Sequence, residues 1–312
     1  MMRLTAIGTS GSFPGTDSPA SCYLVDYDDG DRQWRVVLDL GNGAMGALQA
    51  YTELGRIDAL VLSHLHADHC IDVTTLFVRY RYDPQYFCPA DGAEAVDPRP
   101  ALPAWAPAGA EARLTAAYHV EPGASPVPGS PDPVALGEVF DFRDLAPRTP
   151  FRVGPLEFEP FLVDHPVEGY AFRITDPTGA VLTYSGDTDE CEELVAAAQD
   201  ADLFLCEAAF QEDRDTARGI HLTGLRAGAS ATRAGARTLV LTHIPPWTDR
   251  GIIRAEAAGT YDGPIELAKP GSTWTVAADG PRCLGPGGAS GAAPAPTIDI
   301  PAGIAPAGDR QE

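Results

Sequence analysis

A cluster of metal-binding side chains follows one short apolar run. In VLSHLHADHC (61–70), His64, His66, Asp68 and His69 lie within six positions of a chain that has only seven histidines. The apolar run before them is typical of a strand buried on both faces of a sheet. On extended backbone, residues two apart point the same way, so His64 and His66 can reach one ion. Asp68 and His69 face a neighbouring point. The pattern therefore predicts two adjacent ions at the carboxyl edge of an α/β sheet.

Three further candidate ligands end other predicted strands. They are His165 in LVDHPVEGY, Asp187 in YSGDTDE and His243 in LTHIPPW. Imidazole nitrogens together with carboxylates suit zinc, manganese or iron, with coordination positions left open for water. His119, in AAYHVEP, has no such placement and is interpreted as a structural residue.

Apolar runs separated by glycine and proline turns predict two rounds of strands and helices. Strands are expected at 3–8, 21–27, 33–41, 56–64, 151–163, 168–175, 180–187, 201–210, 238–243 and 274–278. Helices are expected at 42–55, 72–82, 189–199 and 223–235. Two mixed sheets, each covered by helices on its outer face, account for this order.

The length and the hydrophobic content of 44% favour one domain over residues 1–278. Residues 83–135 are rich in proline and acidic residues, and we interpret them as an irregular insertion near the site, with a helix at 109–118. Residues 279–312 are rich in Gly, Pro and Ala, which predicts a flexible tail.

The charge balance limits the partners that the chain can attract. Lys and Arg total 22 against 44 Asp and Glu, which gives a formal net charge of −22. This charge disfavours long-range attraction to nucleic acid or to an anionic membrane. The sequence shows neither a signal peptide nor an uncharged apolar run of about 20 residues. Its six cysteines form no C-x-x-C pair, so we expect reduced thiols in a cytoplasmic protein with no membrane partner.

Together these motifs resemble the metallo-β-lactamase superfamily, and the resemblance covers residues 1–278. It implies a four-layer αβ/βα sandwich of two mixed sheets flanked by helices, with a dinuclear metal site. Asp39 in LDLGNG matches the first motif of the superfamily, which is usually structural. The implied ions are two divalent cations, zinc first, with manganese or iron as alternatives. The implied ligands are His64, His66 and His165 on one metal and Asp68, His69 and His243 on the other, with Asp187 bridging both.

Two further stretches resemble elements of the RNase Z-like branch. HLTG (221–224) and LCEAAF (205–210) resemble the H-x-T and E-A-T-F elements, in which a histidine held by a glutamate protonates the leaving oxygen. A phosphodiester needs such a donor because an alkoxide is a poor leaving group. The resemblance implies that His221 is the general acid and that Glu207 orients it. Alternatively, His221 is a solvated residue before a Thr223 N-cap, and Glu207 is a carboxylate at a strand end.

The implied chemistry is phosphodiester hydrolysis. Two ions about 3.5–4 Å apart would bind a bridging hydroxide that attacks phosphorus, with Asp68 accepting a hydrogen bond from it. The opening LTAIGTSGSFPGTDSPASCYLV, with the metal motifs, resembles bacterial cyclic-nucleotide phosphodiesterases, which convert cyclic AMP to AMP. The base preference and the choice between 2′,3′ and 3′,5′ substrates stay open, and the resemblance also implies a homodimer.

An RNase Z-like ribonuclease is the main alternative. In the short bacterial tRNA-processing forms a long arm separates the motifs of His165 and Asp187, but here only 21 residues do, enough for two strands and a turn. Together with the net charge, this argues against tRNA and for a small phosphodiester. A hydrolase of lactams or thioesters shares the metal ligands but does not need His221 and Glu207.

Two features of the chain are expected at the rim of the metal site. The loop GTSGSFPG (8–15) follows a strand and is interpreted as a tight turn that shapes the rim, with phosphate binding as the alternative. Trp247 follows two prolines and either stacks on a nucleobase beside His243 or packs in the core.

Overall fold

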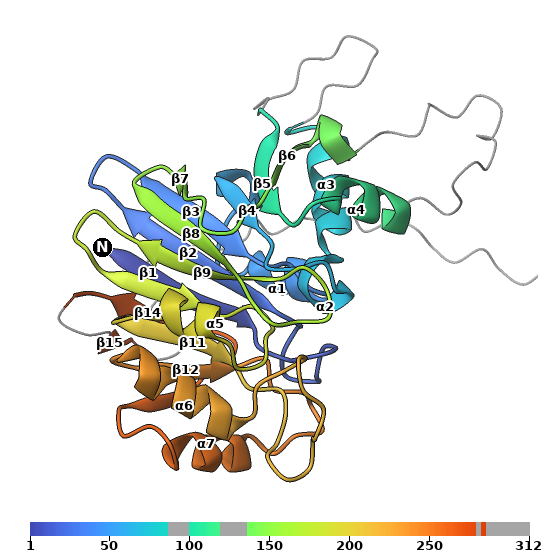
Figure 1. Ribbon diagram of the computed structural model, residues 1–312. Helices are drawn as coiled ribbons and strands as arrows, with labels where there is room; N and C mark the ends of the chain where they lie inside the picture. The colour runs from blue at the N-terminus through green and yellow to red at the C-terminus, as the bar shows by residue number, and fades with distance from the viewer. Residues whose placement is uncertain (87–99, 119–135, 279–281, 285–312) are drawn as a thin grey trace, which may run out of the picture.

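Two mixed β-sheets lie face to face between layers of helices (Figure 1). The computed structural model describes residues 1–86, 100–118, 136–278 and 282–284. The first sheet has the order β15 (Arg282–Cys283), β14 (Thr273–Val276), β1 (Met2–Gly8), β2 (Cys22–Asp28), β3 (Gln33–Leu38), β4 (Ala59–Val61), β5 (Leu102–Ala106), β6 (Phe140–Asp144). The second has the order β13 (Ile265–Leu267), β12 (Leu239–Thr242), β11 (Leu203–Glu207), β10 (Val181–Tyr184), β9 (Tyr170–Thr175), β8 (Leu156–Leu162), β7 (Phe151–Val153).

Each sheet carries its own helices on the outside (Figure 1). The first sheet is covered by α1 (Ala44–Leu48), α3 (Val73–Tyr82) and α4 (Ala110–Tyr118), and the short α2 (Ala67–Cys70) follows β4. The second is covered by α5 (Glu192–Ala197), α6 (Gly224–Ala234) and α7 (Arg250–Ala258). Two 3₁₀ turns, η1 (Leu54–Arg56) and η2 (Leu136–Glu138), complete the described elements.

The buried apolar residues form three cores, one between the two sheets and one between each sheet and its helices. Strand β2 shows the reason, because successive side chains of a strand point to opposite faces. Tyr23 and Val25 belong to the core between the two sheets, whereas Cys22 and Leu24 belong to the core under α1 and α3. A third core lies between the second sheet and α5 to α7. These cores confirm the predicted four-layer αβ/βα sandwich.

Some predicted elements differ from the structure. Residues 102–106, inside the segment predicted to be irregular, form β5 between β4 and β6. Prolines at 100, 103 and 107 interrupt this run and hide the strand, since proline is rare in paired strands. The helix predicted at 42–55 ends after α1, and the rest of the stretch forms turns and the 3₁₀ turn η1.

The predicted helix at 109–118 is present as α4, whereas β6, β13 and α7 were not predicted. The first residues of the predicted tail include β15, which pairs with β14. Residues 87–99, 119–135 (with His119), 279–281 and 285–312 lie outside the described residues.

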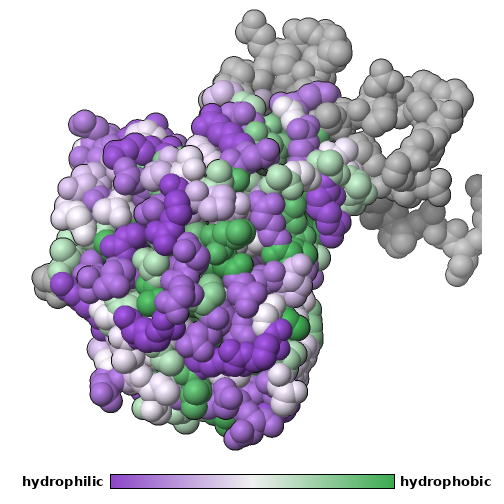
Figure 2. Space-filling model, in the orientation of Figure 1, coloured by the Kyte–Doolittle hydropathy of each residue, from purple (hydrophilic) through white to green (hydrophobic). Residues whose placement is uncertain are grey.

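The exposed surface is mainly polar on the face in view. Figure 2 shows hydrophilic residues over most of this face, with hydrophobic residues gathered in smaller patches between them. Among the described residues, none of the helices has the length and apolar character that crossing a bilayer requires.

Candidate metal centre

The candidate ligands meet because several strands end at the same edge of the sandwich. Strands β10, β11 and β12 are parallel to one another. Strand β8 has the same direction, because β9 is antiparallel to both of its neighbours. Their carboxyl ends therefore lead into loops on one side, which carry His165, Asp187 and His243. The loop between β4 of the first sheet and α2 adds His64 and His66.

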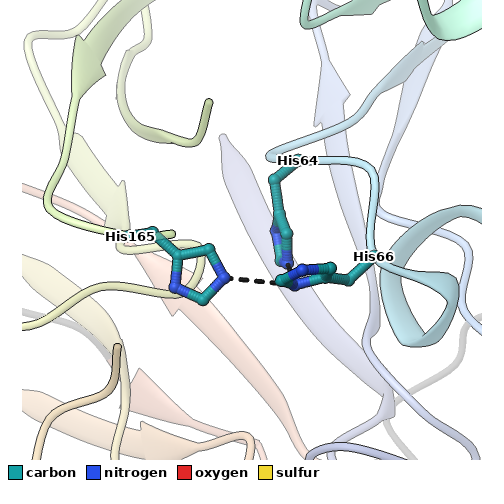
Figure 3. A group of neighbouring side chains, drawn as sticks. All are labelled: His64, His66 and His165. Carbon is teal, nitrogen blue, oxygen red and sulfur yellow. Dashed lines mark hydrogen bonds between the residues drawn. The ribbon is translucent and has the colours of Figure 1, made fainter. Parts of the chain in front are cut away.

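Three imidazoles form the first group of the site. Figure 3 shows the rings of His64, His66 and His165 directed toward one another. The Nδ1 atom of His66 lies 3.0 Å from Nε2 of His64 and 3.1 Å from Nε2 of His165. Because three ring nitrogens converge on one small volume, they can ligate a single cation.

Two carboxylates and two imidazoles form the second group, and all four residues are buried. The Nε2 atoms of His69 and His243 are 3.1 Å apart. Asp68 Oδ2 lies 3.2 Å from the His243 nitrogen and 3.6 Å from the His69 nitrogen. The donor atoms of this group all lie within 4.8 Å of one another, close enough to hold a second cation.

Asp187 lies between the two groups. Its Oδ2 is 3.7 Å from His64 Nε2, whereas its Oδ1 is 3.2 Å from His69 Nε2. One carboxylate oxygen thus faces each group, which is the placement that a bridging ligand requires. The structure brings together all seven residues of the predicted ligand set, and we propose the same division of ligands between two ions.

The protonation states of the first group suit a cation. Burial lowers the pKa of His64 well below its usual value, and it also lowers the pKa of His66 and His165. These imidazoles are therefore held in the neutral form, and this form binds metal.

The second group also fits a cation. Burial raises the pKa of Asp187, but the neighbouring His243 and His69 lower it more strongly, so the carboxylate stays charged. Asp187 Oδ1 and His243 Nδ1 are buried 3.4 Å apart, and neither makes a hydrogen bond with any residue in the described ranges. A bound cation would compensate the buried Asp187 Oδ1.

Asp39 contacts the second group through His69. Its Oδ2 accepts hydrogen bonds from the Tyr184 hydroxyl at 2.6 Å and the Ser63 hydroxyl at 2.7 Å, and it lies 2.7 Å from His69 Nδ1. This contact leaves Nε2 of His69 directed to the site, as in the carboxylate–histidine–metal arrangements that orient ligands. Sequence reasoning assigned Asp39 a structural role only.

We expect Asp39→Asn to weaken metal binding by about 10- to 100-fold, the usual effect of losing a carboxylate behind a histidine ligand. Asparagine tolerates the left-handed backbone that Asp39 adopts, at φ 55°, so the substitution changes mainly the charge. Metal content after dialysis against graded chelator concentrations measures the effect. An unchanged affinity would contradict the orienting role.

His221 lies beside both groups. Its ring centroid is 5.5 Å from the rings of His165 and His243, and its Nδ1 is 2.8 Å from Glu207 Oε1. Burial lowers the pKa of His221, but Glu207 and Asp187 raise it more, to about 9. The fold therefore places a proton-holding imidazole next to the candidate metal site.

Glu207 is itself fixed by the backbone. It is fully buried, and its two oxygens accept hydrogen bonds from Thr188 N at 3.0 Å and Ala209 N at 2.9 Å. Glu207, His221 and His243 also form a third group whose donor atoms lie within 4.8 Å of one another. Because hydrogen bonds already satisfy Glu207, we interpret this group as the contacts that position His221 and not as a cation site. The alternative interpretation expected Thr223 to be the N-cap of α6, which it is. It also expected His221 to be solvated, but this side chain is mostly buried.

A buried ion pair that sequence reasoning missed holds the loop before His221. Asp189 accepts a hydrogen bond from Gly219 N at 2.8 Å, and it forms an ion pair with the buried Arg226 of α6. The next residue of the loop, Ile220, offers its carbonyl to His165 Nδ1 at 2.8 Å. The pair therefore ties α6 to the loop that carries both His221 and the partner of His165.

Replacing Arg226 with methionine should lower the free energy of unfolding by about 3 kcal/mol, because Asp189 would keep a buried charge with less compensation. The exposed Arg218, 3.0 Å from Asp189, limits the loss. Urea denaturation measures it. Arg233→Met, which removes only exposed ion pairs on the same helix, is the matched control and should have a much smaller effect. Equal effects of both variants would contradict this assignment.

The geometry agrees with the comparisons to known proteins. The profile of the beta-lactamase superfamily domain matches residues 35–244, a span that includes every candidate metal ligand. The chain belongs to the metallo-β-lactamase superfamily. Members of this superfamily are metal-dependent hydrolases, which is the general activity that the His and Asp groups support.

Three relatives illustrate the range of this superfamily. The uncharacterised protein ML1173 of Mycobacterium leprae is 42% identical over 279 residues, covering 89% of each chain. Ribonuclease Z of Halorubrum lacusprofundi is 32% identical over 308 residues, covering 86% of this chain and 96% of its own. The crystal structure of the metallo-beta-lactamase fold protein YhfI from Bacillus subtilis has a TM-score of 0.69 at 27% identity, covering 88% of this chain and 100% of its own.

Proposed function

We propose that this superfamily member is a phosphodiesterase that hydrolyses 3′,5′-cyclic nucleotides, cyclic AMP to AMP first among them. The observation that carries the proposal is the position of His221. Its Nδ1 faces Glu207, so Nε2 is the ring nitrogen left to donate a proton, and the ring lies beside both candidate metal groups. Hydrolysis of a phosphodiester has a specific use for such a donor, whereas lactam or thioester hydrolysis does not.

The residues would divide the work as follows. Two divalent cations, zinc first, would supply a nucleophilic hydroxide at neutral pH and neutralise the phosphoryl oxygens. Asp68 would accept a hydrogen bond from the attacking water and orient it. His221 would protonate the leaving oxygen on the opposite side of phosphorus, while Glu207 fixes the ring and stabilises its charge.

An RNase Z-like activity is the second candidate, and the sequence similarity to a ribonuclease Z favours it. Two observations favour a small substrate instead. The residues between His165 and Asp187 are occupied by β9 and β10 with a short turn, which leaves no room for a long arm there. The formal net charge of −22 also opposes the binding of a long polyanion.

The deciding experiment measures AMP release from 3′,5′-cyclic AMP by the purified protein with Zn²⁺ or Mn²⁺. Parallel reactions contain 2′,3′-cyclic AMP, a precursor tRNA or a thioester. Metal-dependent release that is absent in Asp68→Ala supports the proposal. Cleavage of the precursor tRNA without turnover of either cyclic nucleotide would replace it with the ribonuclease, and turnover of thioesters alone would exclude both.

A further inference from the structure

We infer that Phe13 and Trp247 form a stacking platform for the nucleobase of the substrate at the rim of the metal centre. The two rings belong to different loops but lie side by side, with centroids 5.2 Å apart and planes inclined by 35°. The chemical identity of this ligand rests on the proposed function, whereas the platform itself rests on the packing of the two loops.

The loop that carries Phe13 is pressed against the loop that carries a candidate metal ligand. A Cβ atom at Gly11 would collide with the carbonyl oxygen of His243 and would lie 3.1 Å from its ring nitrogen Nδ1. One at Gly15 would lie 3.3 Å from the Pro246 side chain. Glycine is therefore required at Gly11, because it lets the two backbones approach closely.

Both aromatic residues are held on ordered backbone. The Ser10 hydroxyl donates to the carbonyl of Phe13 at 2.7 Å, and Thr9 N donates to Ser18 Oγ at 2.9 Å across the base of the loop. On the other loop, Thr248 N donates to the carbonyl of Pro245 at 2.9 Å, which closes a turn around Trp247. A fixed platform binds a ligand with little additional loss of conformational entropy.

The exposure changes sharply along the second loop. His243 is 2% exposed, but Trp247, four residues later, is 61% exposed, and Phe13 beside it is 43% exposed. Both aromatic residues are therefore exposed, on two loops that contact each other at the candidate ligand His243. The alternative that Trp247 packs in the core is wrong.

A nucleobase is the ligand that this arrangement suits. The phosphate of a nucleotide would lie at the cations, and the flat base would extend toward the rim. Stacking on aromatic side chains tolerates every base, because each base has a π-face. The platform therefore supplies affinity for a nucleoside group without a strong preference among bases.

The test compares two ligands, one with a base and one without. Calorimetry on the metal-loaded protein measures the dissociation constants of AMP and of ribose 5-phosphate, without any need for turnover. We expect AMP to bind about 5- to 100-fold more tightly. Trp247→Ala should remove most of this difference, Trp247→Phe should keep part of it, and Ile252→Ala, an exposed apolar residue on α7, should keep all of it.

Three outcomes would overturn the inference. The wild-type protein could bind AMP and ribose 5-phosphate equally, or Trp247→Ala could weaken both ligands by the same factor. Trp247→Ala could also dissociate a dimer in sedimentation experiments while the AMP preference persists, which would make the pair a contact between two copies. Because binding is measured directly, a protein that prefers AMP but fails to hydrolyse cyclic AMP would contradict only the proposed function.

Discussion

Replacing Asp68 with alanine should reduce kcat/KM for a phosphodiester about 1,000-fold or more and should lower the metal content. Asp68 combines two tasks, since it lies among the donor atoms of the second group and would also orient the attacking water. Burial raises the pKa of Asp68, but the hydrogen bond from His243 and the charge of His69 have a larger, opposite effect. The net shift lowers the pKa, so the side chain is a carboxylate. Steady-state kinetics together with elemental analysis of bound metal measures both effects.

Two variants serve as controls for Asp68→Ala. Asp68→Asn keeps the size and one ligand oxygen but removes the charge, so it should retain more metal than the alanine variant. Asp31→Ala removes an exposed carboxylate in the turn between β2 and β3 and should behave as the wild-type protein does. Full metal content with a loss of less than 10-fold in kcat/KM would rule out Asp68 as a ligand.

Replacing His221 with alanine should lower kcat/KM by about 100- to 10,000-fold for a substrate with an alkoxide leaving group. The loss should be much smaller for bis(p-nitrophenyl) phosphate, because p-nitrophenolate leaves without protonation. Bound metal should not change, since the proposed ligands exclude His221. Comparing the two substrates therefore separates proton donation from a general defect of the site.

Glu207→Gln tests the same proton donation as His221→Ala and should have a smaller effect. It removes the charge that stabilises a protonated His221 while keeping a side chain of similar shape among Thr188 N and Ala209 N. We expect an intermediate loss that is again selective for the alkoxide leaving group. A loss of metal in either variant would instead assign the third group, with Glu207, His221 and His243, to cation binding.

The local part of the site could be predicted from the sequence. His64, His66, Asp68 and His69 follow one strand closely, so their mutual placement depends on strand and turn geometry alone. The placement of His165, Asp187 and His243 at strand ends also indicated a shared edge, because apolar runs mark strands well.

The supporting contacts could not be predicted, because they join residues that are distant in the chain. Asp39 and His69 are 30 positions apart, and Asp189 and Arg226 are 37 apart. No local pattern in the sequence distinguishes such a carboxylate from a solvated one. By contrast, α7 had a readable signal, since Asp249 accepts hydrogen bonds from Gly251 N and Ile252 N as an N-cap.

The candidate ligands come from both halves of the sandwich. His64 and His66 follow a strand of the first sheet, whereas His165, Asp187 and His243 follow strands of the second. A cation held between them would act as a non-covalent cross-link, and its binding free energy would add to the apolar contacts that keep the two sheets together. Metal supply would then affect the resistance of the protein to unfolding as well as its catalytic competence. In a cell that lacks the metal, the protein would be less stable and more sensitive to proteases.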